Sequence, residues 1–161
     1  MFRELLEART AVERALSYQS ARNITADQIS VLEEIVAKME DPEIPTDRFV
    51  ELNLEFHGQI AAASANRVLQ ALQLTIRTMQ GSTVGAFYSS EVRADVIADH
   101  AKVLGALRAR DSELAADEMG AHLDNFLAFL SKHHPDVLEL RLEPLMPTGV
   151  EFDPLSVRSE T

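Results

Sequence analysis

Apolar residues recur three and four positions apart along most of this chain, and no useful stretch alternates between apolar and polar residues. The first spacing follows one face of an α-helix, whereas alternation is what a half-buried β-strand requires. Six segments carry the helical pattern, separated by short breaks. We therefore expect an all-α protein, an antiparallel bundle of six or seven helices joined by short loops.

Local signals mark where several of these helices begin and end. The run Thr25–Gln28 predicts a capping box, and Asn66 is the expected N-cap of the fourth helix. Gly81 and Gly85 weaken the far end of that helix, so the segment up to Ser90 is expected to bend or move. The fourth helix carries its apolar stripe on Leu69, Leu72, Ile76 and Met79. The six helices are expected near residues 2–21, 25–39, 46–64, 66–79, 90–107 and 112–134.

The length of the chain fits one helical domain followed by a tail. It has 161 residues, of which 46% are hydrophobic, enough for a single core. Residues 1–134 are expected to form the helical domain. Residues 135–161 contain three further prolines after Pro135 and are predicted to be a C-terminal tail, part of it disordered. No apolar run approaches the roughly 20 residues that span a membrane, and the N-terminus has no signal-peptide pattern.

Charge and cysteine usage exclude several classes of function. The formal net charge is -11, and there is no cysteine. An acidic surface repels phosphate backbones, so this chain by itself is not expected to bind nucleic acid or an anionic membrane. The missing cysteines exclude disulfides and thiolate ligands and fit a reducing cytoplasm, where we place the protein. A small anionic ligand stays compatible with this charge, because a buried cation can reverse the local field.

Four polar residues lie on the apolar faces of three separate helices. Asn53 and His57 are four residues apart, just over one turn, so they project from the same face. His100 and His122 are each in phase with the apolar residues of a later helix. Buried imidazoles need partners, and a divalent cation would satisfy three lone pairs at once. The residues alone leave two interpretations open: a shared metal site, or three core histidines that each have their own hydrogen bond.

The donor set limits the metal. Imidazole nitrogens with an amide oxygen suit Zn best here, with Ni, Mn, Fe and Co as alternatives, and they do not suit Ca or Mg. Three histidines on zinc leave at least one position open. Because Asn53 is neutral, the two positive charges of the ion would not be compensated by its ligands. The open position should then favour an anion, most simply a carboxylate.

Two further charged residues have a functional and a structural interpretation each. Arg9 lies on the apolar stripe of the first helix, where it would either clamp a ligand carboxylate or form a salt bridge with a neighbouring helix. Glu118 lies one turn before His122. It would either support the metal site, as an internal anion or a partner of a ligand, or be a solvated surface acid.

The order and spacing of five short motifs resemble a known family. In chain order they are Leu6-Glu7-Ala8-Arg9 with Val12-Glu13, Asn53-x-x-Phe56-His57, Ala63-Ser64-Ala65-Asn66, Asp99-His100 with Val103-Leu104-x-Ala106-Leu107, and Ala115-x-x-x-Met119-x-x-His122-Leu123. Over about residues 3–130 the chain resembles the FadR C-terminal (FCD) ligand-binding domain. That domain is the effector half of a subfamily of GntR-type bacterial transcription regulators.

The resemblance implies an antiparallel helical bundle around a central cavity. It implies a divalent ion held by an Asp or Asn and three His, here Asn53, His57, His100 and His122. It further implies that small organic acids such as lactate, citrate or gluconate bind the ion, that Arg9 assists, and that the domain forms a homodimer. Regulators of this family carry an N-terminal winged helix-turn-helix domain before the bundle. None is expected in this sequence, so DNA is expected as a partner only through such a domain.

We therefore predict a non-enzymatic, effector-sensing domain of a GntR/FadR-type regulator that binds a small carboxylate through a divalent metal. Two alternatives stay open. One is a three-histidine metalloenzyme, a hydrolase or lyase that activates water, with Glu118 as its general base. The other is a structural dimerisation bundle whose histidines bind no ligand.

Overall fold

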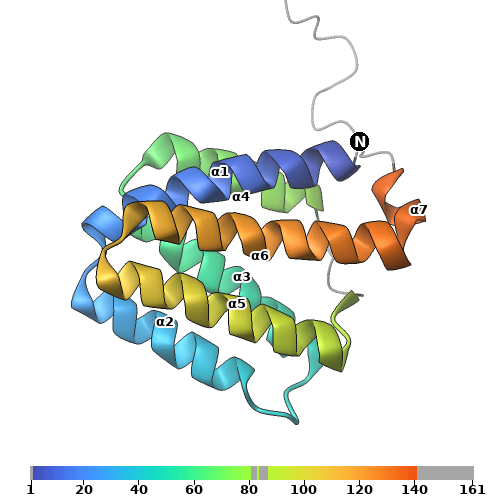
Figure 1. Ribbon diagram of the computed structural model, residues 1–161, viewed down its shortest axis with the longest axis horizontal. Helices are drawn as coiled ribbons and strands as arrows, with labels where there is room; N and C mark the ends of the chain where they lie inside the picture. Colours follow the sequence, from blue (N-terminus) through green and yellow to red (C-terminus); the bar gives the residue numbers. More distant parts are fainter. Residues whose placement is uncertain (1, 81–82, 84–86, 141–161) are drawn as a thin grey trace, which may run out of the picture.

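The computed structural model describes residues 2–80, 83 and 87–140, and the long elements of this part of the chain are all α-helices (Figure 1). The helices are α1 (Phe2–Asn23), α2 (Ala26–Met39), α3 (Thr46–Ala63), α4 (Arg67–Gln80), α5 (Ser90–Ala109), α6 (Ser112–His133) and α7 (Pro135–Leu138). This confirms the predicted all-α bundle. None of these described helices is both long and apolar enough to cross a bilayer.

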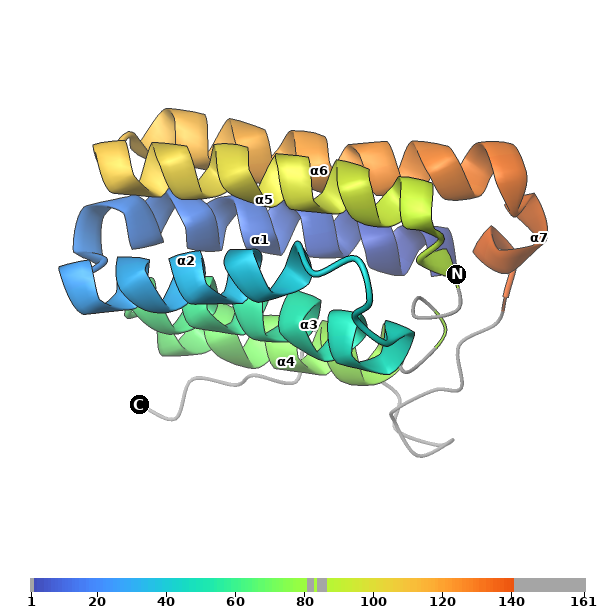
Figure 2. The ribbon, with the colours of Figure 1, turned by 90° about the horizontal axis from the view of Figure 1, so that it is seen from below.

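The helix α1 is the centre of the bundle. Figure 2 shows it between α5 and α6 on one side and α3 and α4 on the other, and it contacts all four of these helices. The helix α2 closes the remaining edge against α3 and α5. Side chains from α1, α3, α5 and α6 therefore meet in one shared interior.

The predicted helix starts are confirmed by hydrogen bonds at the helix N-termini. Thr25 Oγ1 accepts from the backbone N–H of Gln28 at 3.2 Å, and Gln28 Oε1 accepts from the backbone N–H of Thr25 at 3.0 Å, which completes the capping box. Asn66, Ser89 and Asp111 each accept a hydrogen bond from the backbone N–H three residues on. These bonds satisfy N–H groups that a helix leaves without internal partners.

The helix α4 is rotated relative to the stripe expected from its apolar residues. Leu72 is 46% exposed and Leu74 is 61% exposed, whereas Gln73, Ile76 and Gln80 are buried. The expected stripe is therefore wrong at Leu72. The reason is that the two glutamines have partners in the interior: Gln73 Nε2 donates to the carbonyl of His57, and Gln80 Oε1 accepts from Arg9.

The bundle continues beyond residue 134, where a tail was expected to begin. The short helix α7 buries Leu138, and the backbone N–H of Phe2 donates to the carbonyl of Leu140 at 3.2 Å. Residues 135–140 thus pack against the start of α1. The rest of the expected tail, residues 141–161, lies outside the described residues, as do Gly81 and Gly85.

The capping box of α2 gives a first prediction. Thr25→Ala should lower the free energy of unfolding by about 1 kcal/mol, because it leaves N–H groups at the start of α2 without an acceptor. Equilibrium denaturation in urea measures this change. Ser30→Ala is the control: Ser30 is exposed in the middle of the same helix, and its hydroxyl only bonds back to the carbonyl of Ala26. Equal effects of the two substitutions would contradict a stabilising cap.

Candidate metal centre

Three histidines from three helices meet inside the bundle. His57 of α3, His100 of α5 and His122 of α6 are 1%, 0% and 4% exposed. Each offers a ring nitrogen, and these nitrogens all lie within 4.8 Å of one another. Asn53 is buried one turn before His57 on the inner face of α3. Two nitrogens bound to one zinc ion at about 2.0–2.1 Å lie no more than about 4.2 Å apart, so the rings would close in slightly to share an ion.

Several of the buried polar atoms in this interior have no hydrogen-bond partner among the described residues. They are Asn53 Oδ1, His57 Nε2, both ring nitrogens of His100 and, on α1, Ser17 Oγ. The ring of His100 stacks on Phe56 with centroids 3.9 Å apart, so packing rather than hydrogen bonding holds it. Buried polar atoms are nearly always satisfied in folded proteins, and leaving one unsatisfied costs roughly 1–3 kcal/mol. A divalent ion would satisfy Asn53 Oδ1, His57 Nε2 and one of the two nitrogens of His100.

Glu13 of α1 orients His57. Its carboxylate oxygen Oε2 contacts Nδ1 of His57, and its other oxygen accepts from Nε of Arg9 at 2.8 Å. Burial by itself would raise the pKa of Glu13, but His57 and Arg9 outweigh burial and hold this pKa well below its usual range. Glu13 is therefore a carboxylate at neutral pH. It keeps the proton of His57 on Nδ1 and leaves the Nε2 lone pair free for an ion.

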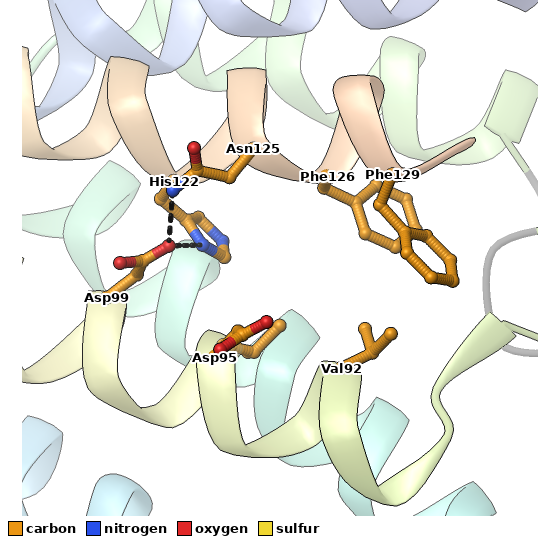
Figure 3. Close-up of a pocket in the computed structure, with 8 residues that line it drawn as sticks. Val92, Asp95, Asp99, His122, Asn125, Phe126 and Phe129 are labelled. Carbon is orange, nitrogen blue, oxygen red and sulfur yellow. Dashed lines mark hydrogen bonds and ion pairs between the residues drawn. The ribbon is translucent and has the colours of Figure 1, made fainter. Parts of the chain in front are cut away.

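Asp99 of α5 lies beside His122 in a similar but looser arrangement. Figure 3 shows its carboxylate between His122 and Asn125, with Oδ2 3.7 Å from Nδ1 of His122 and 3.1 Å from Nδ2 of Asn125. Nζ of Lys102 donates to Oδ1 at 2.7 Å. The interaction with His122, together with those from Lys102 and Asn125, holds the pKa of Asp99 well below its usual range despite burial. A nearby carboxylate favours the His122 tautomer whose Nε2 is free.

Tyr88 orients Asn53. Nδ2 of Asn53 donates to the hydroxyl of Tyr88 at 3.1 Å, which leaves Oδ1 as the free end of the amide. The Tyr88 ring packs against Phe49 and Phe126, with centroids 5.4 and 5.7 Å away. Burial raises the pKa of Tyr88 to about 12, so the hydroxyl keeps its proton at neutral pH. An amide oxygen held in this way is a suitable additional metal ligand.

The protonation of the histidines suits metal binding. Burial lowers the pKa of His57 to about 4, although Glu13 opposes the shift. Burial also places the pKa of His100 well below its ordinary value, and repulsion from His122 and His57 adds to this. Both rings are neutral at pH 7. A neutral imidazole has the lone pair that a metal ion needs.

The charged residues expected near the site have different surroundings. Arg9 is buried and pairs with Glu13 of its own helix, not with an acid on a neighbouring helix, and its Nη1 lies 3.4 Å from Oε1 of Gln80. Glu118 is half-buried on α6, where its charge raises the pKa of the exposed Lys102. Of the two interpretations of Glu118, the structure favours the solvated acid.

Sequence reasoning missed the role of three residues that orient the expected ligands. Glu13 and Asp99 stand in the family-like motifs, but no role was expected of either. The spacing of Glu13, four residues after the buried Arg9, is the signal that could have identified it. Tyr88 had no comparable signal, because its contact with Asn53 joins residues 35 positions apart.

The histidine pKa values predict how the metal-free protein responds to acid. The pKa of His57 falls from an ordinary 6.5 to about 4 on folding. Between these values the unfolded chain binds the proton and the folded protein does not, so stability falls as the pH falls. The loss from His57 between pH 7 and pH 4 should be on the order of 3 kcal/mol. Urea denaturation of metal-free protein across this range measures it.

Two matched variants test whether the buried ring of His57 causes this loss of stability in acid. His57→Gln should make the decline in stability shallower. His133→Gln, at an exposed histidine near the end of α6, should leave the decline unchanged. A pH-independent free energy of unfolding between pH 7 and pH 4 would show that His57 is not buried in its neutral form.

Comparisons with known proteins agree with this architecture. The structure of E. coli McbR/YncC superposes with a TM-score of 0.71 at 18% sequence identity, covering 81% of this chain and 68% of that chain. The structure of Streptococcus agalactiae GntR gives a TM-score of 0.64 at 26% identity, covering 76% of this chain and 56% of that chain. This chain therefore spans little more than half of the second protein. No curated protein matches the sequence.

The family assignment rests on the sequence match. One of the two structural neighbours is named GntR. The family model described as FCD domain matches residues 4–125, which includes all four expected metal ligands and Arg9. The match covers most of the chain, and its range agrees with the resemblance found in the motifs. This chain belongs to the FCD domain family.

Proposed function

We propose that this domain senses a small carboxylate through a divalent transition metal, most simply Zn²⁺, held by Asn53, His57, His100 and His122. Its family and its structural neighbours support an effector-binding regulatory domain. The observation that carries the metal is the buried cluster of three histidines, in which Nε2 of His57 and both nitrogens of His100 have no partners among the described residues. Nitrogen-rich sites of this kind select transition metals over Ca²⁺ or Mg²⁺.

The charge balance of the interior supports an anionic effector. The four proposed ligands are all neutral, so they leave both charges of the ion uncompensated. The two nearby carboxylates are already engaged, Glu13 by Arg9 and His57, and Asp99 by Lys102 and Asn125. A carboxylate at an open position would supply the missing negative charge.

Arg9 is placed to assist such an anion. Its guanidinium is buried, and its Nη1 makes only a long contact of 3.4 Å with Gln80. An effector carboxylate could replace this weak contact with a stronger charge-assisted pair. The protonated hydroxyl of Tyr88, whose pKa responds to the charge of Arg9, is a second donor in the same interior.

The alternatives find less support. A hydrolase or lyase would need a general base near the open position, and Glu118, its expected base, is partly exposed beside Lys102 instead. A purely structural bundle would leave the nitrogens of His100 unsatisfied at a cost in stability. We therefore favour sensing. Binding would tie α3, α5 and α6 to one point and change the preferred geometry of the bundle, and in a dimeric regulator this would alter the spacing of its DNA-binding domains.

Substitution of His100 separates the metal site from a structural core. His100→Leu should abolish the rise in melting temperature that Zn²⁺ gives the wild-type protein, because one of three imidazoles is lost. The metal-free variant should be more stable than the metal-free wild type by roughly 1–3 kcal/mol, since the unsatisfied nitrogens are gone. Protein purified without a histidine tag, melted with and without chelator, tests both. No response of the wild type to Zn²⁺ or chelator would contradict the proposal.

Substitution of Arg9 tests whether its guanidinium binds the carboxylate of the effector. Arg9→Lys keeps the positive charge beside Glu13 but loses the planar fork that binds carboxylates in two places. Affinity for the best stabiliser in a panel of acetate, lactate, citrate and gluconate should fall about tenfold, a loss of ~1.4 kcal/mol. Zn²⁺ affinity should change little. Arg77→Lys on α4, outside the cluster, is the matched control. Calorimetric titration of Zn²⁺-loaded protein gives both affinities, and equal affinity for the two variants would exclude Arg9 as a carboxylate ligand.

A further inference from the structure

The histidine cluster is buried, so a metal ion needs a path from solvent to reach it. A pocket between α5 and α6 comes closest, because His122 forms part of its wall (Figure 3). Its lining residues are Val92, Asp95, Val96, Asp99, His122, Asn125, Phe126 and Phe129. Two other pockets on the described residues, one beside the α1–α2 turn and one between α3 and α4, contain none of the three histidines.

Side chains that can bind a metal ion line the polar side of this pocket, from its mouth to the histidine cluster. Asp95 is exposed at the surface, and the Asp99 side chain below it is 10% exposed. Asp99 in turn faces Nδ1 of His122, which belongs to the cluster. A cation that enters here would meet first carboxylate oxygens and then imidazole nitrogen. A transition metal prefers imidazole nitrogen to carboxylate oxygen. An ion that first binds Asp99 would therefore move on to His122.

The pocket is large enough for a metal ion with a few water molecules. Its cavity volume is about 50 Å³, and one water molecule needs roughly 10–15 Å³ of such space. A partly hydrated ion fits this space. The opposite wall is apolar, formed by Val92, Val96, Phe126 and Phe129. An apolar wall lowers the local dielectric and strengthens the attraction of the carboxylates for a cation.

The charges around the mouth favour cations. Asp95 and Asp99 line the pocket and are negative, and Lys102 is a positive group that interacts with both. Lys102 is exposed and bound to Asp99 at 2.7 Å. These two negative charges outnumber the one positive charge of Lys102, so the mouth is acidic. An incoming divalent ion can displace the exposed ammonium from Asp99, because it carries twice the charge.

We propose that the α5–α6 pocket is the route by which divalent cations reach the three-histidine site, with Asp95 attracting the ion and Asp99 binding it transiently before His122. This inference rests on the proposed function, because it requires that the cluster bind a metal. It assigns Asp99 two tasks: to orient His122 and to carry the ion.

The absence of cysteine permits a direct test. In an Asp95→Cys variant, a bulky maleimide reagent reacts only at the mouth of the pocket. Asp124→Cys, with the same reagent, is the matched control, because Asp124 is an equally charged, exposed residue of α6 outside the pocket lining. The measurement is the rate of Co²⁺ uptake by metal-free protein, followed by the absorbance of the bound ion, together with the equilibrium affinity.

The labelled Asp95→Cys variant should take up Co²⁺ about tenfold more slowly than the labelled control. Its affinity should stay within about twofold of the control, because release slows equally. Equal uptake rates in the two labelled variants, with Co²⁺ bound, would overturn the route and leave the proposed function intact. No Co²⁺ uptake by the unlabelled wild type would overturn both.

Charge substitution gives a second, independent measurement. Asp95→Asn should slow Co²⁺ uptake at low ionic strength, and the difference from wild type should disappear at high salt, where surface charges are screened. Asp124→Asn removes the same charge from the neighbouring helix and should leave uptake unchanged. If both substitutions slow uptake equally, the overall acidity of the protein attracts the ion, and the pocket does not.

Discussion

The burial of imidazole nitrogens without hydrogen-bond partners is the constraint on which the interior of this protein depends. His100 is fully buried, and neither of its ring nitrogens has a partner among the described residues. A core selected for stability alone would hold an apolar side chain there, since an unsatisfied polar atom destabilises the fold. A core that holds an ion needs this arrangement, because the ion supplies the missing interactions. The metal-free bundle is thus less stable than its packing would permit.

The ligands are held in unequal ways. His57, His122 and Asn53 each have a partner that orients them, from α1, α5 and the segment before α5 respectively. His100 is held only by stacking on Phe56. Three oriented donors and one that is held only by packing suit the adaptable effector site that we propose. Because the partner of His57 is in turn bound to Arg9, an effector that contacts Arg9 would also affect His57, a proposed metal ligand.

Much of the site could be anticipated from the sequence because helices repeat regularly. The inner faces of α3 and α5 are buried as their periodicity predicts, and this alone turned His57 and His100 inward. The apolar periodicity of α4 gave the wrong inner face. It predicted that Leu72 faces the core, but Leu72 is exposed and Gln73 is buried. Periodicity assumes that polar residues avoid the interior. That assumption fails where buried groups such as Arg9 need polar partners.

The amino-acid sequence by itself determined the helices, their caps and the faces on which the candidate ligands lie, because these depend on residues within one or two turns of each other. The tertiary structure alone decided that nitrogens of the three rings lie within 4.8 Å of one another. It also decided which partners orient the rings and where the pocket beside His122 opens. These features depend on how α1, α3, α5 and α6 pack. Contacts such as Glu13 with His57, 44 positions apart, leave no periodic trace along the chain.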